Sequence, residues 1–124
     1  MPGCQFRPYV FQPTFQKFAS KTCQGAFLHV TDRRAFRPVM TAVAVLQACR
    51  RHWPDRASIW RGPPYEYEFQ KLPFDILAGN AWLREAIEEQ TPLQTIADRM
   101  EEELWRFEPK RLDARLYGSA ARNR

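Results

Sequence analysis

The sequence predicts a small α+β fold, in which a sheet of two to four strands packs against about three helices. Three observations carry this prediction. Two early segments are rich in aromatic and β-branched residues, later segments repeat apolar residues at helical spacing, and the 124 residues suffice for one compact core. We therefore expect residues 1–124 to form a single domain.

The strands are expected at 5–15 and 24–31. In the first, Pro8 and Pro13 each remove a backbone donor, which is typical of an edge or irregular strand. The second alternates between two faces, with Ala26, Leu28 and Val30 on one and Phe27, His29 and Thr31 on the other. We expect the helices to cover one face and leave the other to a ligand or a partner.

In the middle of the chain, the sequence predicts helical segments separated by a short strand and a long loop. One helix is expected to begin at Pro38 and to end in the basic cluster 50–52. A short strand around Ser58–Trp60 and a long loop over 61–73 follow. A turn of helix over 74–77 is then closed by Gly79, and Asn80 is placed to cap the next helix.

The last helix is expected to start at Thr91 with a capping box, in which Gln94 reaches back to the helix start. Its buried stripe is predicted from the apolar residues at helical spacing, which are Leu93, Ile96, Ala97, Met100, Leu104 and Phe107. Pro109 is expected to end this helix. The carboxylates of residues 101–103 point in different directions, which is typical of a solvated surface.

Composition excludes several classes of function. The net charge is +5, but the basic residues are scattered and form no block, which disfavours nucleic-acid binding. No stretch reaches the ~20 apolar residues of a membrane span, and the first ten residues lack the apolar run of a signal peptide. The compartment is left open.

The three cysteines, Cys4, Cys23 and Cys49, form neither a CxxC pair nor a zinc-type spacing with the histidines. We therefore expect no metal site and no cofactor. A cross-strand disulfide between Cys4 and Cys23 is conceivable in an oxidising compartment, but free thiols are favoured.

Candidate chemistry is sparse. Neither an opposed carboxylate pair nor a nucleophile beside a base is visible. His29 and Asp32 close the second strand and lead into a turn with Arg33, yet the residues alone favour a structural histidine and an aspartate that bonds its own turn. The Arg7 guanidinium either binds a carboxylate through two hydrogen bonds or is exposed to solvent at the edge of the sheet. Tyr65 and Tyr67 either stack on a sugar ring or pin the loop that carries them.

Five segments together resemble a known family. They are GCQFRPYVFQPTFQKFASKTCQG, LHVTDRRAFRPV, the loop with Pro64, Tyr65 and Glu66, FDILAGNAWLREAIE and RFEPKRLDARLY, which span nearly all of 3–117. The family is that of the exo-β-N-acetylmuramidases of the NamZ type. The resemblance implies a Rossmann-like amino-terminal domain, a smaller carboxy-terminal domain and a substrate cleft between them. It also implies release of N-acetylmuramic acid from the non-reducing ends of peptidoglycan fragments.

The resemblance covers the carboxy-terminal domain alone, since the chain opens well inside the family's pattern. The Rossmann-like domain with its glutamate is expected to be a missing partner, and this chain by itself to be inactive. The alternative is a free-standing interaction module that binds cell-wall fragments without enzymatic activity. Full-length relatives are expected to be secreted or associated with the cell envelope.

The resemblance also changes the interpretation of the site residues. Arg7, His29 and Asp32 fall on motif positions and are carried over as residues that line the cleft or face the other domain. The lactyl carboxylate of muramic acid calls for a cation, for which Arg7 and Arg33 are the candidates. With Tyr65, these residues make up the predicted substrate-binding set, and no catalytic residue is assigned.

Overall fold

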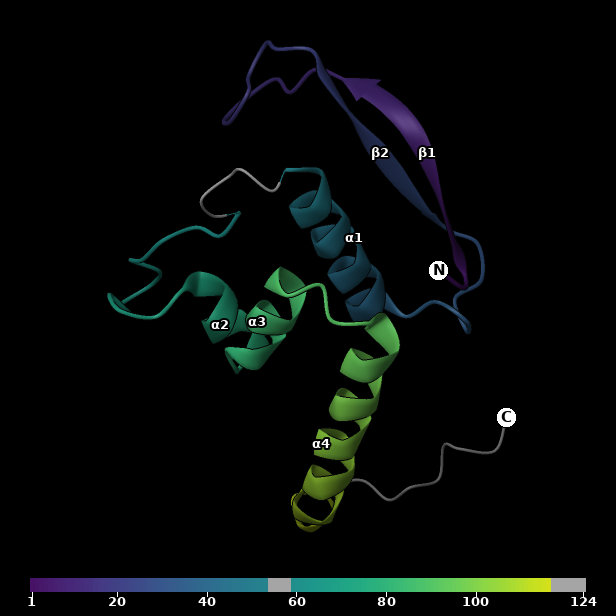
Figure 1. Ribbon diagram of the computed structural model, residues 1–124, viewed down its shortest axis with the longest axis vertical. Helices are drawn as coiled ribbons and strands as arrows, with labels where there is room; N and C mark the ends of the chain where they lie inside the picture. Colours follow the sequence, from purple (N-terminus) through teal and green to yellow (C-terminus); the bar gives the residue numbers. More distant parts are fainter. Residues whose placement is uncertain (54–58, 117–124) are drawn as a thin grey trace. The chain divides into compact units, whose positions relative to one another are not determined.

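The computed structural model describes residues 1–53 and 59–116, which form a two-stranded antiparallel sheet and a series of helices (Figure 1). The elements are β1 (Cys4–Phe11), β2 (Cys23–Val30), α1 (Pro38–His52), α2 (Pro73–Ala78), α3 (Trp82–Glu88) and α4 (Leu93–Asp113). The small α+β class is thereby confirmed. The chain divides into two compact units, one up to Ala42 and one from Val43 onward, which are described separately.

The first unit is built on the hairpin of β1 and β2. Cys4 pairs with Val30 and Phe11 with Cys23, so the ladder runs without interruption past Pro8 and ends before Pro13. Leu28 and Val30, on the face that we expected helices to cover, are 38% and 46% exposed. The hairpin therefore displays side chains on both faces.

Cys4 and Cys23 of the hairpin lie too far apart to form a disulfide with one another. Cys4 lies at one end of the ladder and Cys23 at the other, and both thiols are free. Seven residues of extended strand span ~23 Å, whereas bridged Cα atoms lie within about 7 Å. Free thiols, the favoured alternative, are what the structure shows.

The core of the second unit is formed by α1, α3 and α4. Its buried apolar side chains are Val43, Leu83, Ile87 and Ile96. Gln47 is also buried, and its amide donates a 2.7 Å hydrogen bond to the carbonyl of Thr91, which ties α1 to the start of α4. The burial of this polar side chain was not predicted, and the hydrogen bond explains why the interior tolerates it.

The helix boundaries around α2 and α3 match the prediction. Gly79 caps α2 with φ 74°, a left-handed conformation that glycine adopts without steric cost. The Asn80 side chain accepts a 3.0 Å hydrogen bond from the Leu83 amide at the start of α3. Arg84 of α3 then forms a two-pronged ion pair with Asp75 of α2, at 2.9 and 3.2 Å, which fastens the two short helices together.

Helix α4 departs from the prediction in three ways. No side chain caps its start, because Gln94 bonds Asp98 at 2.7 Å instead of reaching back, so the capping box was wrong. The helix continues past Pro109 to Asp113, since a proline keeps a helical φ and the Glu108–Arg111 ion pair spans it. Leu104 and Phe107 are 66% and 55% exposed, so the predicted stripe is buried only in the first half of the helix.

The predicted strand around Ser58–Trp60 is not formed where the structure describes it: Ser58 lies outside the described residues, and Ile59 and Trp60 form a bend. The Trp60 ring instead packs against Phe74 at a tilt of 45°, with 4.4 Å between ring centroids, and its indole N–H donates a 2.6 Å hydrogen bond to Glu88. These contacts anchor the start of the 61–72 loop to α2 and α3. Within the described part of the chain, no helix is long and apolar enough to cross a membrane.

Candidate functional site

One face of the hairpin gathers the aromatic and cationic side chains of both strands. Side chains alternate between faces along a strand, and the register pairs Arg7 with Phe27 and Gln5 with His29. We call this surface the aromatic face and define it by Arg7, Tyr9, Phe11, Phe27 and His29. It therefore unites two residues of the predicted set, Arg7 and His29, with three aromatic rings.

The rings of the aromatic face contact one another in a row. Tyr9 lies 6.1 Å from Phe11 and 5.5 Å from Phe27, and Phe27 meets His29 edge-on at 4.7 Å, all between ring centroids. The Arg7 guanidinium lies 5.9 Å from the centroid of Tyr9, within the range of a cation–π contact. Tyr9, Phe11 and Phe27 are each nearly half exposed. The result is an ordered platform of rings and a cation that remains open to solvent.

Gly25 makes room for this row. It pairs with Tyr9 across the ladder, and a Cβ atom placed on it would lie 3.4 Å from the Phe11 ring. The Phe11 ring therefore covers the gap that a glycine leaves in the sheet surface. All members of this arrangement belong to the two paired strands.

The turn after β2 is held by Asp32. Its carboxylate accepts hydrogen bonds from the amides of Arg34 and Ala35, at 2.8 and 3.3 Å. Gly3 approaches the turn so closely, with φ 71°, that a Cβ atom there would lie 2.5 Å from the Asp32 carbonyl oxygen, and its own carbonyl accepts the amides of Thr31 and Asp32. The turn is thus tied to the start of β1.

The predicted set is divided between the two units. Arg7 and His29 share the aromatic face, while Asp32 holds the turn in the way that the residues alone favoured, with Arg33 exposed on it. Tyr65 belongs to the second unit, where it is half-buried. Sequence reasoning missed Tyr9 and Phe11. The odd-numbered alternation from Gln5 to Phe11 was the available signal, and the two prolines obscured it.

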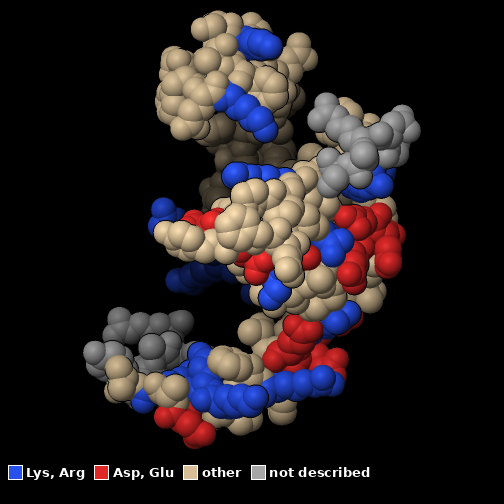
Figure 2. All heavy atoms as spheres, turned by 90° about the vertical axis from the view of Figure 1, so that its left-hand side faces the viewer, with Lys and Arg blue, Asp and Glu red and all other residues tan. Residues whose placement is uncertain are grey.

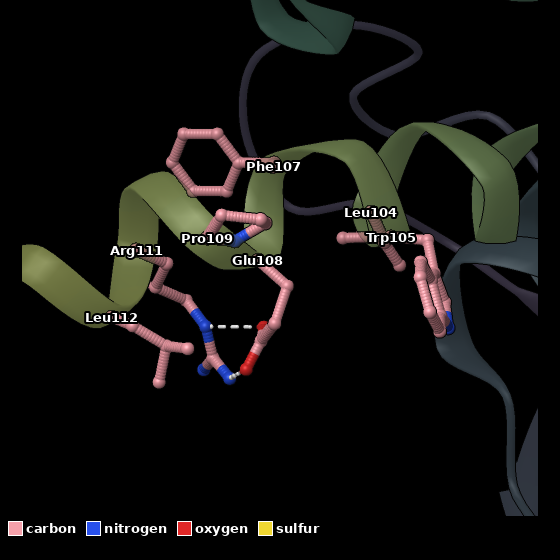
Figure 3. A pocket seen from close by; sticks show the side chains of 7 residues that line it. All are labelled: Leu104, Trp105, Phe107, Glu108, Pro109, Arg111 and Leu112. Carbon is pink, nitrogen blue, oxygen red and sulfur yellow. Dashed lines mark hydrogen bonds and ion pairs between the residues drawn. The ribbon is translucent and has the colours of Figure 1, made fainter.

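The described residues offer little else for chemistry. They contain no group of three or more His, Cys, Asp or Glu side chains placed to hold a metal ion. Basic and acidic side chains are interspersed over the helices on the face shown in Figure 2. A hollow of about 760 Å³ lies along α4, lined by apolar side chains and the Glu108–Arg111 ion pair (Figure 3). None of the predicted site residues lines it.

Comparison with known proteins agrees with the resemblance seen in the sequence. The model of a family described as exo-beta-N-acetylmuramidase NamZ, C-terminal, matches residues 1–117. The chain belongs to this family. The aromatic face and the Asp32 turn lie within the matched NamZ region, as do all described helices and the 61–72 loop.

A NamZ relative shows how much of a longer protein this region represents. The peptidoglycan beta-N-acetylmuramidase NamZ of Bacillus subtilis (strain 168) is 34% identical over 118 residues, which cover 94% of this chain and 26% of the relative. The chain thus spans about a quarter of the length of that relative. No solved structure matches the chain.

Proposed function

We propose that this NamZ-type chain forms the carboxy-terminal side of the substrate cleft of an exo-β-N-acetylmuramidase. In this proposal a Rossmann-like amino-terminal domain supplies the catalytic acid, and the enzyme hydrolyses terminal N-acetylmuramic acid from peptidoglycan fragments. The observation that carries the proposal is the aromatic face, on which Arg7 and His29 accompany an exposed row of rings.

The chemistry of muramic acid fits that face. The sugar ring has an apolar surface that packs against aromatic rings, and its lactyl group carries a carboxylate that a guanidinium binds with two parallel hydrogen bonds. The contact between Arg7 and the Tyr9 ring restrains the cation beside the rings, which lowers the entropy lost on binding. His29, at the edge of the row, is placed to hydrogen-bond a hydroxyl or the acetamido group.

The same face lacks the groups that glycoside hydrolysis requires. Most glycosidases place two carboxyl groups on opposite sides of the scissile bond. The aromatic face itself carries no carboxylate, and that of Asp32 already bonds two amides of its turn. We therefore expect this chain to bind substrate and to leave hydrolysis to the partner domain.

A chimera tests this proposal. The carboxy-terminal quarter of the Bacillus subtilis relative is replaced by this chain, and release of N-acetylmuramic acid from a muramyl disaccharide is measured. We expect activity from the chimera and none from the chain alone. A folded but inactive chimera would contradict the proposal, as would turnover by the chain alone that disappears when one of its own carboxylates is mutated.

One observation favours the alternative of a free-standing binding module. The contacts that order the aromatic face all lie within the hairpin, so the platform does not depend on another domain. This alternative requires binding of cell-wall fragments by the chain alone together with an inactive chimera. Nucleic-acid binding would require retention on heparin that falls steeply with salt, which the interspersed charges do not support.

A further inference from the structure

The hairpin loop, which we define as residues 12–22 between β1 and β2, is ordered by contacts of its own. The Pro13 carbonyl accepts the amide of Ser20 at 2.8 Å, and the Gln12 side chain donates a 2.8 Å hydrogen bond to the carbonyl of Ser20. Two further backbone hydrogen bonds close turns inside the loop. The loop therefore has a defined shape although it lies outside the ladder.

Three residues of the hairpin loop have a left-handed backbone although none of them is glycine. Gln16, Phe18 and Ser20 each have φ 60°. Side chains disfavour this conformation, which glycine adopts freely, and such strain persists where the surrounding contacts hold it, often at functional sites. At position 18 the strained residue carries an aromatic ring, and the residue is 59% exposed. The loop thus presents this ring to solvent on a constrained backbone.

A second phenyl ring and two ammonium groups accompany the Phe18 ring. Phe15 is 71% exposed, and Lys17 and Lys21 are exposed as well. Neither lysine forms an ion pair within the described residues, and residues 1–31 contain no Asp or Glu to neutralise them. The end of the hairpin that carries the loop lies at the top of Figure 2, where the visible face shows basic and no acidic side chains. The surface of the loop is therefore apolar and positively charged at once.

We propose that the hairpin loop docks on an anionic membrane surface. The two lysines are attracted to the negative charge, and each contributes roughly fivefold to the affinity for anionic lipids. The phenyl rings leave water for the apolar layer beneath the headgroups, which a soluble polyanion does not offer. Lysine side chains at such a boundary bury their aliphatic stems and keep the ammonium group among the headgroups. Membrane docking does not rest on the proposed function, because the aromatic face contains no residue of the loop.

Flotation of the whole chain with vesicles tests this proposal. Vesicles of equal parts phosphatidylcholine and phosphatidylglycerol are compared with vesicles of phosphatidylcholine alone. We expect the chain to bind the anionic vesicles more tightly by roughly tenfold or more, and we expect this preference to shrink as salt screens the charges. The double variant with Lys17→Gln and Lys21→Gln should lose most of the preference.

Variants of the two rings separate insertion into the membrane from simple attraction of charges. Phe15→Ser should weaken binding to the anionic vesicles by roughly tenfold. Phe18→Gly should have a similar effect without disturbing the loop, because glycine adopts φ 60° without steric cost. Phe69→Ser is the matched control, since Phe69 of the second unit is also 71% exposed, and it should bind like the parent chain.

Several results would overturn the proposal. They are the absence of flotation with anionic vesicles, equal binding to both kinds of vesicle, and an equal loss of binding in Phe15→Ser and Phe69→Ser. Binding of a soluble polyanion such as heparin that depends on the lysines but not on the rings, without binding of vesicles, would assign the loop to a different class of partner. Unchanged vesicle binding in Phe18→Gly together with Phe15→Ser would show that the rings do not enter the membrane.

Discussion

Arg7 lies directly opposite Phe27 in the hairpin register, and its guanidinium contacts the ring of Tyr9 on its own strand. The cation is therefore held among rings while its hydrogen-bonding edge remains open to solvent. In the proposed function, this arrangement offers the carboxylate of muramic acid a charged partner beside an apolar platform. It makes Arg7 the residue whose replacement separates recognition from stability.

Arg7→Ala is expected to weaken binding of a muramyl ligand by about 10–100-fold, because a hydrogen-bonded charge pair contributes ~1.5–3 kcal/mol. Arg7→Lys should recover only part of this loss, since an ammonium group cannot bind a carboxylate in two-pronged fashion. Calorimetric titration with the muramyl and neutral disaccharides measures both effects. An equal loss of affinity for the two ligands would show that Arg7 does not recognise the carboxylate.

His29→Ala distinguishes a binding role from a structural one. The ring is on the aromatic face and contacts Phe27, so its removal should weaken ligand binding by roughly tenfold and change the melting temperature by only a few degrees. Binding and a thermal melt on the same variant decide the matter. A clear loss of stability with unchanged binding would identify His29 as a structural histidine.

The Arg84–Asp75 ion pair is predicted to stabilise the second unit. Both side chains are less than one-fifth exposed. Asp75→Asn should lower the free energy of unfolding by about 1–3 kcal/mol, because it removes the nearest charged partner of a shielded guanidinium and leaves only the more exposed Glu85 and Glu88. Glu102→Gln, in the exposed pair with Arg106, is the control and should cost about 0–0.5 kcal/mol. Denaturant titration compares them, and equal effects would contradict the prediction.

The stabilisation of the turn at 68–71 by the hydrogen bonds of the Glu68 carboxylate, which accepts the Gln70 and Lys71 amides, should depend on pH. These hydrogen bonds hold the pKa of Glu68 in the folded chain below 4.5, so its contribution is fully present above that value and is lost as the pH falls through the lowered pKa. The protection of the Gln70 and Lys71 amides from hydrogen exchange should fall in acid in the parent chain. In Glu68→Gln it should vary less with pH. Constant protection in the parent chain across the acid range would contradict this account.

The sequence predicted elements where local chemistry decides the structure. Pro38 at a helix start, Gly79 at a helix end and the Asn80 cap each act on the backbone within a few residues, and all three are found as expected. The alternation of β2 likewise placed Phe27 and His29 on one face, and the register confirms it. Such features need no knowledge of distant contacts.

Other features depend on distant partners, or on which of several neighbours a side chain bonds. The backbone carbonyl of Thr91 accepts the amide of Gln47, 44 residues away, and Gln94 bonds Asp98 instead of the helix start, so the capping box did not form. The spacing of apolar residues along α4 predicted burial of Leu104, which is exposed. Spacing does not show how much of a helix is covered by the elements that pack against it. Composition of a loop also could not show that Tyr67, and not Tyr65, is displayed.

Mapping by NMR shows whether the aromatic face contacts muramic acid, as we propose. A muramyl disaccharide is titrated into the whole chain, and signals of Arg7, Tyr9, Phe27 and His29 are compared with those of Leu28 and Val30 on the opposite face of the hairpin. We expect saturable shifts on the aromatic face that exceed those on the opposite face. Equal shifts on both faces, or no response from the hairpin while signals elsewhere change, would contradict it.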